Sequence, residues 1–282
     1  MFDAHVRQIS KHVYGMKAGK PDRPSLCAVV GTRHSLMLDA GASDAHTRLF
    51  LDGLKAHGVR MPEWVVLTHW HWDHVFGAAE TGLPVIAHAL TAEGLAVMGR
   101  QLWDDGALDA RVASGEEIAF CADNIKLELP EPRHVRIAQP DIVFTDSLDF
   151  DLGGVQVHVR HVGGDHAADA CVAYVEEDGL LFLSDCLYDD IYAEKRTFTR
   201  EKALPLIETI LDFKADIIIE GHNPEPVGRD AFVRQMELMR RAAEISAQFR
   251  GDEAAIQAAF PEMQGNEDWT WYVESFCAGY PR

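Results

Sequence analysis

The chain has 282 residues, 47% of them hydrophobic, and a formal net charge of −19 from 26 basic and 45 acidic residues. A chain of this length and composition can bury a large core, which excludes a disordered protein and favours a single domain over 1–282. The strong negative charge repels polyanions, so we expect no nucleic-acid partner and a small neutral or modestly charged substrate.

The sequence gives no sign of a membrane or secreted protein. Residues 1–7 lack the basic start and apolar segment of a signal peptide, and no later stretch is long enough to span a bilayer. The five cysteines form no CxxC pair, which favours a reducing compartment and mostly buried, apolar roles for them. We therefore expect a cytoplasmic protein without a membrane partner.

The first half of the chain alternates between strand and helix patterns. Apolar runs over 26–31 and 34–41 predict two paired strands, and 44–58 has the apolar spacing of a helix. The run over 64–67 is short, apolar and β-branched, so it predicts a buried strand. This alternation is typical of a layered α/β sandwich.

The second half repeats the pattern, with strands expected over 155–157, 171–175 and 180–183 and a helix over 202–213. Between the halves, 95–140 fits neither, because its turns and prolines indicate an irregular insertion. Long insertions of this kind are often lids or substrate walls, so Trp103 and Phe120 are candidates for an apolar rim; the alternative is a solvated connecting segment.

A C-terminal extension over 229–282 has the composition of helix. Over 229–250 its apolar residues are spaced like one buried face, which predicts packing against the sandwich or against a second copy in a homodimer. Trp269 and Trp271 near the end fit either role. We assign this extension no chemistry.

The densest chemistry in the sequence follows the predicted strand at 64–67. The run His69-Trp70-His71-Trp72-Asp73-His74 places three imidazoles and a carboxylate within six positions. If extended geometry continues, His69 and His71 lie on one side and approach one ion, while Asp73 and His74 begin a helix through 75–79 and point to a second. Buried groups of this kind are costly unless they are paired or bind metal, so the run predicts a two-metal site.

Three later residues complete a pattern of metal ligands. His166 follows a Gly-Gly turn, Asp185 ends the apolar run 180–185, and His222 follows the apolar run 217–219. With the HxHxDH run, this order resembles the metallo-β-lactamase superfamily of metal-dependent hydrolases over roughly residues 10 to 225. Independently of the resemblance, Asp185 and His222 follow apolar runs, and such residues meet at one edge of a layered sheet.

The resemblance implies a four-layer αββα metallo-β-lactamase sandwich formed by a single domain over 1–282, with the insertion and the helical extension. It also implies two zinc ions per chain, or else iron or manganese. One ion would be held by His69, His71 and His166, the second by Asp73, His74 and His222, and Asp185 would bridge them. Asp73 would in addition be catalytic and orient an attacking hydroxide.

Several assignments have rivals in the sequence. His158 and His161 compete with His166, and Cys186 competes with Asp185, because thiolate also suits zinc and the chain has Ser-Asp-Cys where the family often has Thr-Gly-Asp. Asp39, before a glycine turn, either supports a metal ligand or only caps that turn. Each of these alternatives stays open at the level of sequence.

The implied activity is hydrolysis of a small ester, thioester or lactone by a hydroxide activated between two zinc ions. Tyr188, three residues after Asp185, is a second catalytic candidate, since lactonases of the superfamily carry a tyrosine at this offset; the rival view is that it only packs. Trp70 and Trp72 would line the pocket or lie in the core.

Three other functions compete with this activity. They are an iron-dependent oxidoreductase of the same superfamily, a β-lactamase-like or phosphodiester hydrolase, and a silent binding module. The occupied ligand positions count against the binding module. The sequence shows no flavin-binding domain, which counts against the oxidoreductase. The physiological substrate cannot be named from these residues.

Overall fold

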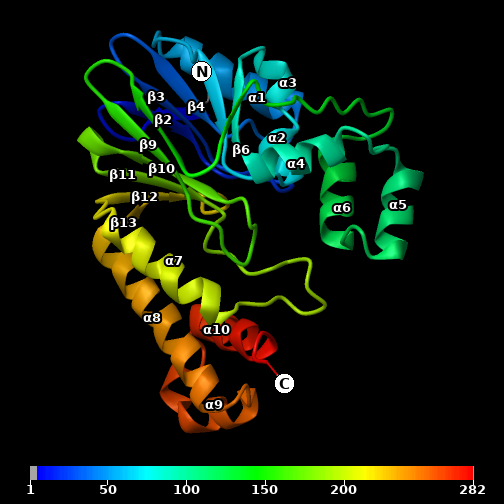
Figure 1. Ribbon diagram of the computed structural model, residues 1–282, viewed down its shortest axis with the longest axis vertical. Helices are drawn as coiled ribbons and strands as arrows, with labels where there is room; N and C mark the ends of the chain where they lie inside the picture. Colours follow the sequence, from blue (N-terminus) through cyan, green and yellow to red (C-terminus); the bar gives the residue numbers. More distant parts are fainter. Residues whose placement is uncertain (1–4, 282) are drawn as a thin grey trace.

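The computed structural model describes residues 5–281, and within them two β-sheets pack between outer helices (Figure 1). The first sheet has seven strands in chain order: β1 Val6–Gln8, β2 Val13–Met16, β3 Leu26–Val30, β4 Ser35–Leu38, β5 Trp64–Leu67, β6 Val85–His88 and β7 Ile142–Phe144. The second sheet has six strands, in the order β13-β12-β11-β10-β9-β8. Their bounds are β8 Ser147–Asp151, β9 Gln156–His161, β10 Cys171–Val175, β11 Leu180–Ser184, β12 Ile217–Glu220 and β13 Val227–Gly228.

Helices cover the outer side of each sheet. The first sheet carries α1 Asp44–Ala56, α2 Trp72–Val75, α3 Ala78–Thr81, α4 Ala89–Met98, α5 Asp105–Ser114 and α6 Ala119–Glu128. The second carries α7 Arg200–Asp212, α8 Arg229–Gln248, α9 Glu253–Ala259 and α10 Glu267–Ala278. Short 3-10 turns lie at Glu176–Asp178 and Pro261–Met263. These layers form the expected αββα sandwich.

Along the central strands, successive side chains point alternately into the core between the two sheets and into the core under the outer helices. This explains why the sequences of these strands are apolar throughout. In β4, Leu36 and Leu38 face the core between the sheets, whereas Met37 faces the helices. In β11, Phe182 faces the core between the sheets and Leu181 faces the outer helices. A strand buried on both faces has no polar alternation, so a continuous apolar run marks it in sequence.

The predicted strands over 26–31, 34–41, 64–67, 171–175 and 180–183 and the helix over 202–213 are confirmed within a few residues. The strand predicted at 155–157 begins at Gln156 and runs on to His161. The helix predicted through 75–79 is two single turns, α2 and α3, separated at Gly77. A Cβ at Gly77 would lie 1.9 Å from Thr47 Oγ1, so the chain bends where α1 packs most closely.

The prediction of an irregular insertion over 95–140 was wrong for most of its length. Helices α4, α5 and α6 occupy it, and α5 and α6 form a hairpin that projects from the sandwich (Figure 1). Asp104 caps α5 by accepting a hydrogen bond from the Ala107 N–H, and Gly115 ends it in the left-handed conformation. The connections 99–104 and 115–118 and the longer stretch 129–141, which contains the prolines, have no strand or helix.

The C-terminal extension is helical, as predicted. Phe232, Met236, Met239 and Ala243 of α8 are buried in the core against the second sheet. The helix α10 adds Trp269 and its neighbours to the same core, and Figure 1 shows it beside α7 and α8. Among the described residues, no helix has the length and apolarity that a membrane crossing requires.

Candidate metal centre

The predicted ligands meet at the edge of the two sheets where β5, β11 and β12 end. His69 follows β5, and His71 stands at the start of α2, which carries Asp73 and His74. Asp185 follows β11 directly, and His222 lies two residues after β12. His166 comes from the loop between β9 and β10. Parallel strand ends at a common edge therefore place residues from distant parts of the chain together.

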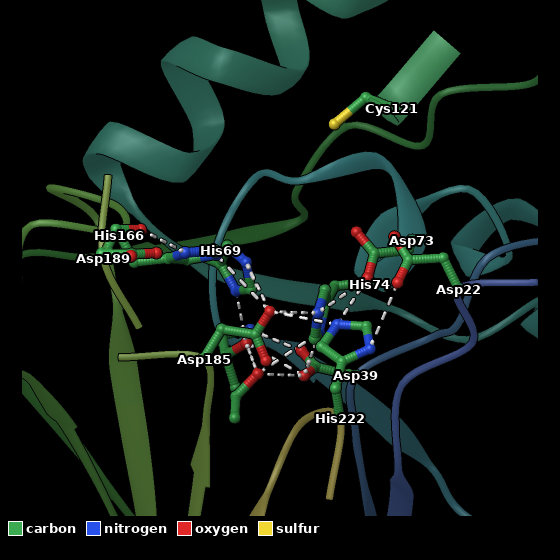
Figure 2. Close-up of polar contacts among 12 residues, drawn as sticks. Asp22, Asp39, His69, Asp73, His74, Cys121, His166, Asp185, Asp189 and His222 are labelled. Carbon is green, nitrogen blue, oxygen red and sulfur yellow. Dashed lines mark hydrogen bonds and ion pairs between the residues drawn. The ribbon is translucent and has the colours of Figure 1, made fainter. Parts of the chain in front are cut away.

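The seven residues form two groups. Within each group, every residue offers one nitrogen or oxygen atom, and these atoms all lie within 4.8 Å of one another. The first group is His69, His71 and His166, and the second is Asp73, His74, Asp185 and His222. All except His222 are buried. Figure 2 shows the two groups side by side.

Asp185 stands between the groups. Its Oδ2 lies 3.2 Å from His74 Nε2 and 3.3 Å from His222 Nε2 in the second group. The same oxygen lies 3.4 Å from His166 Nε2 and 3.9 Å from His69 Nε2 in the first. One carboxylate that faces both sets of imidazoles is the arrangement that a bridging ligand requires.

The donor atoms fit bound cations. His69 Nε2, His166 Nε2 and Asp185 Oδ1 are buried and have no hydrogen-bond partner. An unpartnered polar atom of this kind is costly in a folded protein, and three of them converge on one place. Imidazole and carboxylate together are the ligand types that zinc, iron and manganese share. The residues present therefore suit a pair of divalent cations.

Asp39 forms a hydrogen bond with the imidazole of His74. Of the two roles that the sequence left open for Asp39, it therefore has that of supporting a ligand. His74 Nδ1 donates to Asp39 Oδ2 at 2.8 Å, so Nε2 presents its lone pair to the cluster. Asp39 also accepts hydrogen bonds from the Thr68 N–H, at 2.8 Å, and from the Ser184 hydroxyl, at 3.0 Å. The Asp39 carboxylate thus connects the segments that contain Thr68, His74 and Ser184.

Replacing Asp39 with Asn should weaken the second group without breaking the turn. Asp39 has a φ of 58°, a conformation that Asn tolerates, so Asp39→Asn keeps the turn but removes the negative charge and replaces one of two accepting oxygens with an NH2 donor. We expect metal affinity, measured by competition with a chromogenic chelator, to fall about 10- to 100-fold. An unchanged affinity would show that His74 needs no such support.

His166 is oriented by a residue that the sequence did not single out. Its Nδ1 donates to the backbone carbonyl of Asp189 at 3.2 Å, which leaves Nε2 for the cluster. The contact is made by the backbone of Asp189, and a backbone carbonyl has no sequence signature. The local pattern therefore gave no way to find it.

Burial and charge divide the imidazoles into two kinds. Burial, and then the neighbouring imidazoles, lower the pKa of His69 and of His71 well below the ordinary value. Burial also opposes protonation of His74 and His222, but the nearby Asp73 and Asp185 raise the pKa of both. The second group thus concentrates negative charge, which protons or a cation must balance.

The rivals to these ligands lie elsewhere. The ring of His161 stacks on His88 with centroids 3.9 Å apart, and its Nε2 bonds the Ala168 carbonyl. His158 lies between Asp149 and Glu176. Cys186 is buried in the core under the outer helices. Like the other four cysteines it is free and buried, as expected.

A cavity of about 230 Å³ opens onto the cluster. Apart from the ligand side chains, its walls include Trp72, Phe120, Tyr188 and Ile191. Asp22, a residue absent from the sequence-based candidates, also lines it, and its Oδ1 lies 3.5 Å from His222 Nδ1.

Only part of the expected aromatic rim faces this cavity. Phe120 is 57% exposed and lines it from α6. Trp103 instead packs edge-on against Phe76, with ring centroids 4.8 Å apart. Trp72 is buried and forms part of the wall, while Trp70 stacks on Tyr192. The α5–α6 hairpin thus contributes one apolar side chain of the predicted pair.

Tyr188 lies beside the cluster. Its ring centroid is 5.9 Å from that of His166 and 6.2 Å from that of His222. Burial, and then the charge of Asp185, raise the pKa of Tyr188 well above its ordinary value. The hydroxyl therefore keeps its proton and can act as a hydrogen-bond donor at neutral pH.

Comparison with known proteins agrees with this geometry. A model of the metallo-beta-lactamase superfamily matches residues 21–222. The human protein "Acyl-coenzyme A thioesterase MBLAC2" is 25% identical over 182 residues, and its bovine counterpart is 24% identical. The match covers 60% of this chain and 60% of each relative.

Two solved structures show the same fold. The sec-alkylsulfatase Pisa1 from Pseudomonas sp. superposes with a TM-score of 0.68 at 18% identity, over 98% of this chain and 49% of that one. A metallo-beta-lactamase from Pontibacter korlensis has a TM-score of 0.57 at 22% identity, over 82% of this chain and 96% of the other.

Proposed function

This chain belongs to the metallo-β-lactamase superfamily, and on that premise we propose that it is a binuclear metal hydrolase that cleaves a small ester, thioester or lactone. The observation that carries the proposal is the pair of buried ligand groups that share Asp185. Within the three substrate classes we place thioesters first, because the human relative is named an acyl-coenzyme A thioesterase.

Two groups of side chains would hold the cations. His69, His71 and His166 would bind one, Asp73, His74 and His222 the other, and Asp185 both. Zinc is the first choice, with iron or manganese as alternatives. Divalent cations bound there would supply Lewis acidity and lower the pKa of a coordinated water.

The remaining chemistry falls to side chains of the chain itself. Asp73 Oδ2 lies 3.1 Å from His222 Nε2 and 3.2 Å from His74 Nε2, and the carboxylate lines the cavity. In this proposal Asp73 would accept a proton at the reacting centre and orient a water there. Trp72, Phe120 and Ile191 present apolar surface, which holds an acyl group and limits access of bulk water.

Tyr188 is the proposed donor to the oxygen or sulfur that gains negative charge as the acyl bond breaks. Tyr188→Phe removes only its hydroxyl, so we expect kcat to fall about 10- to 100-fold while metal content is unchanged. Steady-state kinetics on the best substrate, with metal analysis of the same preparation, would measure both. An intact kcat would leave the ring a packing role only.

The activity itself can be tested with a panel of substrates. Zinc-loaded protein would be offered an acyl-coenzyme A, a glutathione thioester, an acyl-homoserine lactone, an aryl ester, a phosphodiester and a β-lactam, with chelator-treated protein as the blank. We expect chelator-sensitive cleavage, strongest among the thioesters and esters. Silence across the panel with two metals bound per chain would overturn the proposal and favour iron-dependent redox chemistry.

A further inference from the structure

We propose that Arg196 binds an anionic group of the substrate at the mouth of the cavity, and so selects acyl substrates that carry a carboxylate or phosphate. This inference rests on the proposed hydrolase function, because it names the substrate class of the same site. Arg196 lies in the segment between β11 and α7. Of the proposed metal ligands, this segment contains only Asp185, at its start.

Apart from the imidazoles, Arg196 is the one positively charged side chain among the described residues that line the cavity. Apart from the imidazoles, the charged groups that line it are Asp22, Asp73, Asp185 and Arg196. The Arg196 side chain is 60% exposed although it forms part of the wall, which places it where the cavity meets solvent. A guanidinium is always charged at neutral pH and matches carboxylate and phosphate oxygens in a fixed plane.

The guanidinium is held in place by a buried carboxylate. Arg196 Nε donates to Asp189 Oδ1 at 2.8 Å, Nη2 lies 2.8 Å from the same oxygen, and the Asp189 side chain is fully buried. The other carboxylate oxygen accepts from Trp271 Nε1 at 2.7 Å and from the Ser275 hydroxyl at 2.9 Å. Both of these donors lie on α10, so the C-terminal helix fixes a residue of the cavity.

This anchorage suits a binding residue. A guanidinium has five N–H donors, and Asp189 engages only some of them, so the others remain for a ligand. Because the side chain is already ordered, binding an anion costs less conformational entropy than it would with a free arginine. Figure 2 shows Asp189, the partner of Arg196, beside His166, whereas Asp22 lies on the other side of the cluster with Asp73.

The competing explanation is that Arg196 only neutralises Asp189. Kinetics on paired substrates distinguish the two roles. One pair is the S-phenyl thioester of glutaric acid with a free carboxylate and its methyl ester, and the other is butyryl-coenzyme A and S-butyryl-N-acetylcysteamine. The first pair tests a carboxylate, and the second tests the phosphate-bearing remainder of coenzyme A.

Arg196→Gln should raise KM for the charged member of at least one pair about 10- to 100-fold and change the neutral member by less than about twofold. Arg196→Lys keeps the charge and should give a smaller rise, and it serves if the Gln variant does not fold. Lys195→Gln is the matched control, because it removes the same charge from the neighbouring residue, which does not line the cavity.

Each outcome has a separate meaning. Equal losses on charged and neutral members in both pairs, or no loss on either, would refute anion binding by Arg196 and leave the hydrolase proposal intact. Failure of the metal-loaded native protein to cleave any of the four thioesters would instead count against the thioesterase assignment itself. Thermal unfolding of each variant would show whether a loss reflects only a weakened fold.

Discussion

Asp185→Ala is expected to abolish turnover and to reduce bound metal to one ion per chain or fewer. A single oxygen of Asp185 lies within 3.9 Å of four imidazole nitrogens drawn from both ligand groups. Asp73, the other carboxylate among the ligands, makes its close contacts with His74 and His222 of the second group. Losing the shared ligand should lower kcat/KM at least about 1,000-fold, since metal catalysis supplies several kcal/mol.

The measurement is metal content by plasma mass spectrometry, followed by kinetics at saturating added zinc. Asp151→Asn is the control, because Asp151 is an exposed carboxylate at the end of β8 that pairs with Arg33. Circular dichroism should show the fold intact in both variants. Native turnover or two retained ions in Asp185→Ala would refute the assignment of a bridging carboxylate.

Gly221→Ala should damage the centre almost as severely, although glycine contributes no ligand. A Cβ at this position would lie 1.7 Å from Asp185 Oδ1, far inside contact distance, and 3.3 Å from the backbone carbon of Ser184. Asp185 or the strand end that carries His222 must therefore move. We expect metal affinity and kcat/KM to fall by at least about 100-fold, because ligands displaced by about 1 Å lose productive geometry.

Gly228→Ala provides the matched comparison. The same methyl group there would meet nothing within 4 Å, and the backbone is not left-handed. Metal titration of the two variants side by side should separate the steric effect at the centre from any general cost of replacing glycine. Equal metal affinity in both proteins would mean that the cluster adapts easily to the added carbon.

Local patterns of the sequence predicted most of the strands and the cluster over 69–74, whereas the resemblance to the superfamily supplied the four-layer fold and the roles of His166, Asp185 and His222. The continuous apolar runs predicted strands buried on both faces, which is what β4, β5 and β11 are. The HxHxDH run was informative because its residues are neighbours in the chain, so a strand end and one helical turn are enough to cluster them. Periodicity and residue type carry this information without any long-range contact.

The insertion was misread because its helices have weak amphipathic patterns. The local signals were present, since Asp104 caps α5 and Gly115 ends it. The turns and prolines around them instead favoured an irregular segment. Only packing of Leu108 and Ile125 into the core beside the first sheet shows that the hairpin is built into the fold.

The sequence by itself thus determined the buried strands, the alternation of strand and helix and the dense run of ligands over 69–74, because each of these depends on residues close together in the chain. The tertiary structure decided which candidates meet. It places His166 at the cluster while His161 stacks on His88, and it turns Asp185 inward while Cys186 joins the core. It also brings α10 to Asp189 across 86 positions of sequence, through Ser275. Contacts over such separations depend on how the layers pack, and no local pattern records them.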